Sequence, residues 1–362
     1  MPELFEKFIK HYHFNLNKDS LLEFNNIKSK NDILLFFSEQ SKLLDFLEHD
    51  TDSLQELLRS CPSSFSFNFV HRKILKKHIL EDDELLDFSM ISMQAIKCCE
   101  QIYPDYPLAI DIKNNLEKSK HFQLVIDEIL GMLDPVDNKL CFNMHPDLKP
   151  IYTKINAIDS GLRDSLTHIS AQWNRDGIVD QANHDIVDEH YIIPVRSDHF
   201  SHNLGSIVYR SKTGQTLYIE PKEIRERVNE KRNLESVFQR EKFKILSKYS
   251  EVFLKHEKLC LHFFDLLINT DRFIAHSSIA LNFQLSLPKF NNSGGHNIKI
   301  KGAHHPLISD AVSNDIEFES SNEGILISGP NTGGKTVLLK ALALHLILPN
   351  FGLCTPSRES VL

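Results

Sequence analysis

The chain has 362 residues, of which 41% are hydrophobic and 25% are charged, proportions that are typical of folded protein and exclude a mainly disordered chain. Its net charge of -8 means that only a local basic surface could attract nucleic acid. The six cysteines show no Cys-x-x-Cys spacing, and the chain has no signal peptide or membrane-spanning run. We therefore expect a cytoplasmic protein with reduced thiols and no membrane partner.

The first 185 residues predict helices that pack on one another. Amphipathic patterns alternate with short polar breaks from Leu4 to about Tyr103, and a later helix is expected to run to about Trp173 after a turn and a short strand. The run Leu124–Glu128 has the look of a strand that ends in metal-binding carboxylates, but the helical spacing around it favours a helix. We interpret residues 1–185 as a helical core and lever domain.

A different pattern begins near Ile186, where β-branched and aromatic residues predict strands. The polar stretch Ser211–Gln215 predicts the turn of a hairpin between two of them. From Pro221 to Pro288, apolar residues recur at spacings of three and four with no Gly or Pro between them, which predicts one unusually long helix. We interpret residues 186–290 as a small β clamp carried on long lever helices.

Basic residues are frequent in the hairpin and in the first half of the long helix. The glutamates that alternate with them favour an ordinary solvated helix face, and a surface that contacts nucleic-acid phosphates is the alternative. The candidate clamp residues are Arg210, Lys212, Arg225 and Lys231.

The segment GPNTGGKT at residues 329–336 matches the phosphate-loop pattern G-x-x-x-x-G-K-[ST]. Small residues at these positions let successive backbone N–H groups surround phosphate oxygens. The apolar run at residues 324–328 predicts a buried strand before the loop. The apolar segment after it predicts a helix, whose positive dipole end would face the phosphates. We interpret residues 291–362 as the N-terminal part of a P-loop ATPase domain, and the chain as mainly α with α/β elements.

The loop predicts ATP and Mg²⁺ as cofactors. Lys335 would stabilise the charge of the β- and γ-phosphates, and the hydroxyl of Thr336 would bind Mg²⁺. The predicted ATP-binding residues are Gly329, Pro330, Asn331, Thr332, Gly333, Gly334, Lys335 and Thr336.

Hydrolysis of ATP also needs a carboxylate for Mg²⁺ and a residue that orients water. The tail that follows the predicted helix has one acidic residue, Glu359, and no apolar strand before it. No catalytic residue other than Lys335 is therefore predicted. We expect that the chain stops inside its ATPase domain and that residues 1–362 alone hydrolyse little or no ATP.

The phosphate loop, the segment SKTGQTLYIEP ahead of the long helix, and the segments AHHPLI and SNDIEF together resemble the MutS family of mismatch-repair ATPases. The amino-acid sequences of the loop and the hairpin are most similar to those of its MutS-two branch. The resemblance implies an ATP-dependent homodimeric clamp that acts on branched or double-stranded DNA in recombination control, or on ribosomal RNA in ribosome rescue, and not on mismatches. It also implies a C-terminal nuclease-like domain, and hence endonuclease activity, beyond residue 362.

The same resemblance assigns roles to individual residues. It places Tyr209–Glu220 in the clamp, and His305, Pro306 and Asn314 beside the base of the nucleotide. Weaker binding of the base is implied by departures from the family's pattern. These departures are His304 in place of Arg, Ala311 in place of an aromatic residue that stacks on adenine, and Pro349, which ends the following helix early.

Two other interpretations remain open. One is an unrelated long-helix ATPase of the chromosome-maintenance class, although its phosphate loop would normally lie near the N terminus. The other is a truncated, non-catalytic remnant or binding module that keeps the lever and the clamp. The coding sequence just after codon 362 would distinguish them, because a continuation with an apolar strand ending in Asp-Glu supports the ATPase. The sequence does not choose between DNA and ribosomal RNA.

Overall fold

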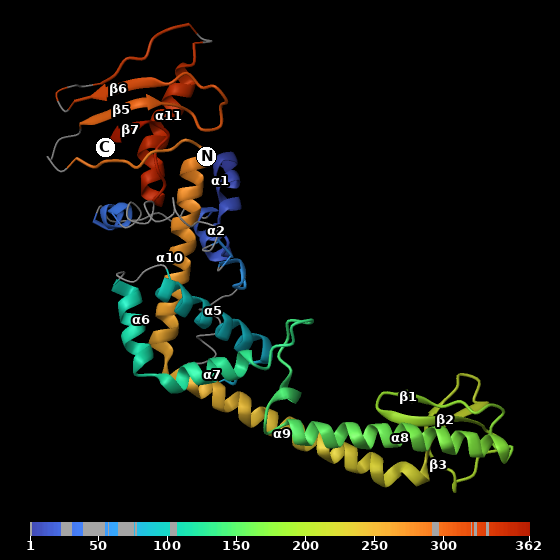
Figure 1. The fold of residues 1–362 in the computed structure, drawn as a ribbon. Coiled ribbons are helices and arrows are strands. Elements are labelled where there is room, and N and C mark those ends of the chain that lie inside the picture. Colours follow the sequence, from blue (N-terminus) through green and yellow to red (C-terminus); the bar gives the residue numbers. More distant parts are fainter. Residues whose placement is uncertain are drawn as a thin grey trace. The chain divides into compact units, whose positions relative to one another are not determined.

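The structure is a computed structural model, and the fold is mainly α with two small antiparallel sheets among the described residues, as the sequence predicts (Figure 1). None of the helices that it describes is both long and apolar enough to cross a membrane. The described residues are 2–22, 31–38, 55–56, 58–63, 76, 78–101, 107–291, 297–319, 321, 324–330 and 333–362.

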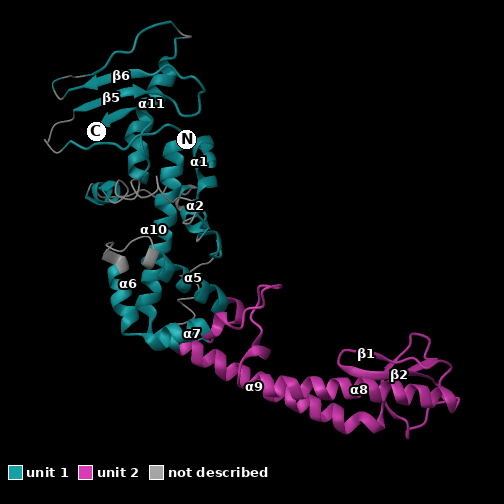
Figure 2. Ribbon diagram, viewed as in Figure 1, with its two compact units in different colours: residues 1–78, 84–127, 252–362 teal, residues 79–83, 128–251 magenta. Residues whose placement is uncertain are grey.

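The chain divides into two compact units, and each unit draws on segments that are distant in the sequence (Figure 2). Unit 1 contains Met1–His78, Glu84–Asp127 and Val252–Leu362, and unit 2 contains Ile79–Asp83 and Glu128–Glu251.

Unit 1 combines the N-terminal helices, the second part of the predicted long helix and the region of the phosphate loop. Besides a helix at residues 31–38, its helices are α1 (Pro2–Phe8), η1 (Ile9–His11), α2 (Asn15–Leu22), α5 (Asp82–Gln101), α6 (Pro107–Glu117), α7 (Lys120–Leu130), α10 (Glu257–Asn282), α11 (Lys335–Ile347) and η4 (Leu348–Phe351). Its three-stranded sheet has the order β6-β5-β7, with β5 (Ile298–Ala303), β6 (Asn314–Phe318) and β7 (Glu359–Val361). The helical prediction for Leu124–Glu128 is confirmed by α7.

The buried helix α10 organises the N-terminal part of unit 1. The carboxylate of Asp271 on α10 is 1% exposed and accepts hydrogen bonds from the backbone N–H groups of His13 and Phe14, at 2.7 and 3.1 Å. It also accepts one from Asn17 Nδ2 at 2.8 Å. Because burial raises the pKa of Asp271 and these donors oppose the shift, the group is stable there only with its partners in place. The turn between α1 and α2 is thus fixed to α10.

Unit 2 is built around a four-stranded sheet that packs on α8 (Lys149–Arg175) and the start of α9 (Arg225–Lys255). The strands are β1 (Asp185–Val187), β2 (His190–Arg196), β3 (Gly205–Arg210) and β4 (Thr216–Pro221), all antiparallel in the order β1-β2-β4-β3. The predicted hairpin is confirmed as β3 and β4, and the helix predicted to end near Trp173 is confirmed as α8. The short strand expected before α8 is only a bridge between Leu133 and Leu140, followed by η2 (Phe142–Met144).

Alternation along the strands explains this core. Tyr191, Ile193 and Val195 of β2 point to one side and are fully buried against α8. On α8, the apolar residues recur at helical spacing and form the facing stripe. The residues of that stripe are Leu162, Leu166, Ile169 and Trp173.

The prediction of one continuous helix from Pro221 to Pro288 is wrong. A short 3-10 turn, η3 (Lys222–Ile224), leads into α9, and α9 and α10 are separated at His256, whose φ and ψ are -108° and 24°. The imidazole of His256 packs against the ring of Phe122 on α7, with centroids 4.9 Å apart. A tertiary contact therefore accompanies this break, and no Pro or Gly marks it in the sequence.

A partly buried ionic cluster joins α8, β2 and α9. Lys231 Nζ lies 2.9 Å from Asp159 Oδ1 and 2.8 Å from the hydroxyl of Tyr191, which itself donates to Asp159. Burial would raise the pKa of the Asp159 carboxyl, but the hydrogen bonds from Tyr191, Arg163 and Lys231 together lower it. The side chain of Lys231 is 14% exposed, so its charge serves the fold of unit 2.

We expect Lys231→Met to lower the free energy of unfolding by about 1–3 kcal/mol at pH 7, because Asp159 would lose a charged partner. The folded pKa of Asp159 lies below its unfolded value, so its stabilisation is present above about pH 4 and is lost as the pH falls further. The difference between the two proteins should therefore shrink below pH 4. Urea unfolding followed by the fluorescence of Trp173, the single tryptophan and part of this core, measures it.

The matched control is Lys248→Met on the exposed side of α9, which should change stability by less than about 0.5 kcal/mol. Equal losses for the two variants, or a penalty that does not depend on pH, would show that the cluster does not stabilise unit 2.

Candidate functional site

The described part of the phosphate loop leads directly into α11. Gly334 caps this helix with φ 78°, a left-handed conformation that glycine adopts without steric cost. No side chain caps the N terminus, and the first hydrogen bond of the helix runs from Leu338 N to Gly334 O at 2.9 Å. An α-helix leaves its first N–H groups without intrahelical acceptors, so this end of α11 can donate to an anion.

The loop also makes contacts within itself. Lys335 Nζ donates to the carbonyl of Gly329 at 2.6 Å, and Gly333 N donates to the carbonyl of Pro330 at 2.9 Å. Thr336 is exposed at the same end of the helix. The structure thus brings together six of the predicted residues, while Asn331 and Thr332 lie outside the described residues.

The strand predicted at residues 324–328 is not formed. These residues have no strand partner in the described part of the chain, and the side chains of Ile325 and Leu326 are 47% and 91% exposed. A buried strand requires neighbours that satisfy its backbone hydrogen bonds, and the partners of β5 within the described residues are β6 and β7. The early end of the following helix is confirmed, because η4 with Pro349 replaces α11 after Ile347.

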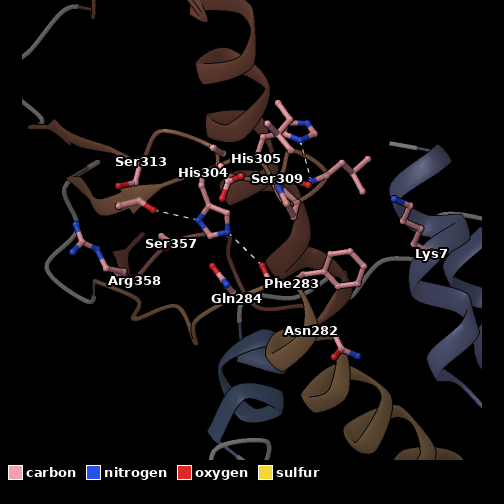
Figure 3. Close-up of a pocket in the computed structure, with 16 residues that line it drawn as sticks. Lys7, Asn282, Phe283, Gln284, His304, His305, Ser309, Ser313, Ser357 and Arg358 are labelled. Carbon is pink, nitrogen blue, oxygen red and sulfur yellow. Dashed lines mark hydrogen bonds between the residues drawn. The ribbon is translucent and has the colours of Figure 1, made fainter.

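A cleft of about 600 Å³ lies between the end of α10, the segment 304–313 and Lys7 of α1 (Figure 3). His304 stands in its middle, with its ring nitrogens 3.3 Å from the carbonyl of Gly302 and 3.4 Å from that of Phe283. His305 and Pro306 also line the cleft, whereas Asn314 begins β6 outside it. None of the described phosphate-loop residues lines it. A role for His305 and Pro306 beside the nucleotide base stays a prediction.

The candidate clamp residues fall into two groups. Arg210, Lys212 and Arg225 are exposed, and none forms an ion pair with a carboxylate that the structure describes. Arg225 donates to the hydroxyl of Ser206 on β3, which holds it beside the hairpin. Lys231, by contrast, is occupied by the internal cluster with Asp159. The structure therefore presents three of the four cations to solvent.

Arg227 is a further exposed cation, one of the basic residues in the first half of the long helix, but it is not among the four candidate clamp residues. Its Nη1 donates to Gly161 O at 3.3 Å and to Ser165 Oγ at 3.2 Å on α8. A Cβ at position 161 would lie only 2.1 Å from its guanidinium, so Gly161 provides the space. Gly161 is visible in the sequence as an isolated glycine inside a helical pattern, which costs stability relative to alanine and can have a packing reason.

No known family profile matches the chain. Curated relatives named "Endonuclease MutS2" do match it. The protein of Halalkalibacterium halodurans is 32% identical over 217 residues, 59% of this chain and 27% of that protein. The protein of Lachnoclostridium phytofermentans is 27% identical over 366 residues, 96% of this chain and 45% of that protein. The protein of Caldanaerobacter subterraneus is 26% identical over 339 residues, 90% of this chain and 42% of that protein.

The matched region therefore spans less than half the length of each of these relatives. In the match with the protein of Lachnoclostridium phytofermentans it includes both the hairpin and the phosphate loop, because that match covers 96% of this chain. The family resemblance inferred from the hairpin and the loop is thus supported along the chain. Over nearly all of its length, the chain is similar to a protein named "Endonuclease MutS2".

Proposed function

We propose that this chain is part of a MutS-type, nucleic-acid-associated ATPase that binds ATP and Mg²⁺ at residues 329–336. The observation that carries the proposal is the loop itself, where Gly334 in a left-handed conformation opens a helix with no side-chain cap. The relatives are named endonucleases, which supports an association with nucleic acid.

The residues of the loop fit the chemistry of a nucleoside triphosphate. The first N–H groups of α11 and the ammonium of Lys335 are donors for phosphate oxygens, and the carbonyl of Gly329 that now accepts from Lys335 would give way to them. The hydroxyl of Thr336 is a hard oxygen ligand suited to Mg²⁺. Bound Mg²⁺ supplies positive charge that neutralises the phosphates.

We propose that the exposed cations of unit 2 contact the phosphates of nucleic acid. Arg210, Lys212 and Arg225 belong to the hairpin and the helix start, and Arg227 extends the set. Phosphate contacts give affinity without base preference, so the predicted ligand is branched or double-stranded DNA, or ribosomal RNA. Lys231 is left out of this set because its ammonium is already paired.

The finer assignments follow from the resemblance and remain part of the proposal. They are a homodimer, a cytoplasmic location, and a role in recombination control or ribosome rescue. Segments 1–185, 186–290 and 291–362 would serve as core and lever, clamp, and start of the ATPase. A binding module that keeps the lever and the clamp without ATP hydrolysis is the second candidate, and a chain that binds no ATP would favour it.

We expect wild-type protein to bind ATP in the presence of Mg²⁺, and Lys335→Ala to weaken the affinity at least about tenfold, because the variant has no ammonium to donate to phosphate. Titration calorimetry measures both. Lys340→Ala, an exposed lysine farther along α11, is the control and should bind ATP as wild type does. Unchanged affinity in Lys335→Ala would rule out the phosphate loop as the site, and a wild type that binds no ATP would favour the binding module.

For nucleic acid, we expect weak binding that falls steeply with salt. Replacing Arg210, Lys212 and Arg225 with Ala should reduce the slope of log K against log salt by about 0.9 for each duplex DNA phosphate that is no longer neutralised. The measurement is a salt series with branched DNA and with a ribosomal RNA fragment. The ligand that wild-type protein binds with the higher affinity at the same salt concentration is the preferred target.

Two controls test the assignment. Lys149, Lys154 and Lys248 replaced together with Ala remove the same charge from exposed positions outside the hairpin and should leave the slope unchanged. Lys231→Ala should also leave the slope unchanged while lowering stability. If both triple variants flatten the slope equally, the attraction is general and the clamp surface is not the binding site.

A further inference from the structure

The cleft around His304 is a polar site that the phosphate loop does not explain. Its volume of about 600 Å³ lies within the usual range for sites that hold small molecules. Three serine hydroxyls and two side-chain amides line it, so donors and acceptors come from several separate segments of unit 1. These residues are Ser309, Ser313, Ser357, Asn282 and Gln284.

The charges at the cleft favour an anion. Lys7 and Arg358 lie at opposite ends of it (Figure 3), and neither forms an ion pair with a carboxylate in the described part of the chain. Two nearby lysines, Lys289 and Lys301, are by contrast paired, because each lies 3.0 Å from a carboxylate oxygen of Glu359. Asp310 is the one acidic residue among the lining residues. Among the residues that line the cleft, two cations thus accompany one carboxylate.

The position of Arg358 depends on the backbone of β5. Its N–H donates to Lys301 O at 2.9 Å, and its side chain crosses Gly302, where a Cβ would lie 2.6 Å from Nε. Gly302 has φ 69°, and its own N–H is held by Asp315 Oδ1 at 2.7 Å. Any other residue at 302 would be strained and would displace the arginine.

His304 connects this cleft to the end of α10. Its ring nitrogens lie near the carbonyl groups of Gly302 on β5 and Phe283 just after α10. Burial lowers the pKa of the neighbouring His305, and the positive charge of Lys340 lowers it further. His305 therefore offers a neutral hydrogen-bonding ring at neutral pH. The floor of the cleft is therefore polar and fixed by backbone contacts, while its ends carry the charge.

We propose that this cleft is a second anion site that binds a small phosphate-bearing molecule between Lys7 and Arg358. A phosphate group carries several acceptor oxygens, which matches cations that are accompanied by hydroxyl and amide donors. The proposed site uses none of the described residues of the phosphate loop, although it shares His305 and Pro306 with the predicted surroundings of the nucleotide base.

The test uses pyrophosphate as the probe and Lys335→Ala as the background, so that the phosphate loop contributes less to the binding. Titration calorimetry at constant ionic strength is expected to show binding to the Lys335→Ala protein. Adding Lys7→Gln or Arg358→Gln is expected to weaken the affinity roughly fivefold to tenfold, as for the removal of one charge-assisted hydrogen bond. The matched control is Lys10→Gln, an exposed lysine of η1 outside the cleft, which should leave the affinity unchanged.

Three results would overturn the proposal. Loss of pyrophosphate binding in Lys335→Ala itself would place the anion on the phosphate loop. Equal weakening by Lys10→Gln would indicate general attraction to positive charge. Adenosine binding as tightly as pyrophosphate, without any effect of Lys7→Gln or Arg358→Gln, would show that the cleft recognises a base. None of these results alters the measurement of ATP affinity in the protein that retains Lys335.

Discussion

The candidate nucleotide site depends on how α11 is anchored. Its last turns are buried with α1 and α10 in one apolar cluster, which includes Leu344 of α11 and continues to Leu348 and Leu353 after it. His276 of α10 adds a hydrogen bond from its buried ring to the carbonyl of Gly352, at 2.9 Å. The first turn of α11 stays exposed, so the helix is held at one end and presents its N terminus at the other. A helix N terminus that is exposed in this way can bind an anion.

Positive charge has two separate roles in unit 2, and burial separates them. A partly buried ammonium must be paired, because the low dielectric makes an isolated charge costly, and Lys231 is paired with Asp159. Exposed guanidinium and ammonium groups stay hydrated and can exchange water for phosphate. Arg225 and Arg227 lie within two turns of Lys231 on α9. Arg225 donates to the hydroxyl of Ser206, and Arg227 donates to the carbonyl of Gly161 and the hydroxyl of Ser165, so none of these hydrogen bonds ends on a carboxylate. The same stretch of sequence therefore supplies both the support of the sheet and its candidate contact surface.

The two candidate anion sites of unit 1 are built differently. The phosphate loop offers backbone N–H groups at a helix end, which would bind the phosphates that all nucleoside triphosphates share. The cleft relies on side chains from α1, the segment after β5 and the residue pair before β7, so its shape depends on tertiary packing. His304 joins the end of α10 to β5 at the centre of this cleft. An anion bound there would contact the same segments that hold α10 and the sheet together.

The sequence by itself determined the features whose signals are local. The spacing of apolar residues predicted α7 and α8, the polar turn predicted the β3–β4 hairpin, and the glycines of GPNTGGKT marked the loop before α11. Tertiary structure decided the rest, because the cause lies in residues distant in the chain. The helix break at His256 accompanies a contact with Phe122, and the pairing of Lys231 requires Asp159 and Tyr191 from other elements. Likewise, the apolar residues at 324–328 favour burial, but a strand forms only where neighbouring strands pair with its backbone hydrogen-bonding groups.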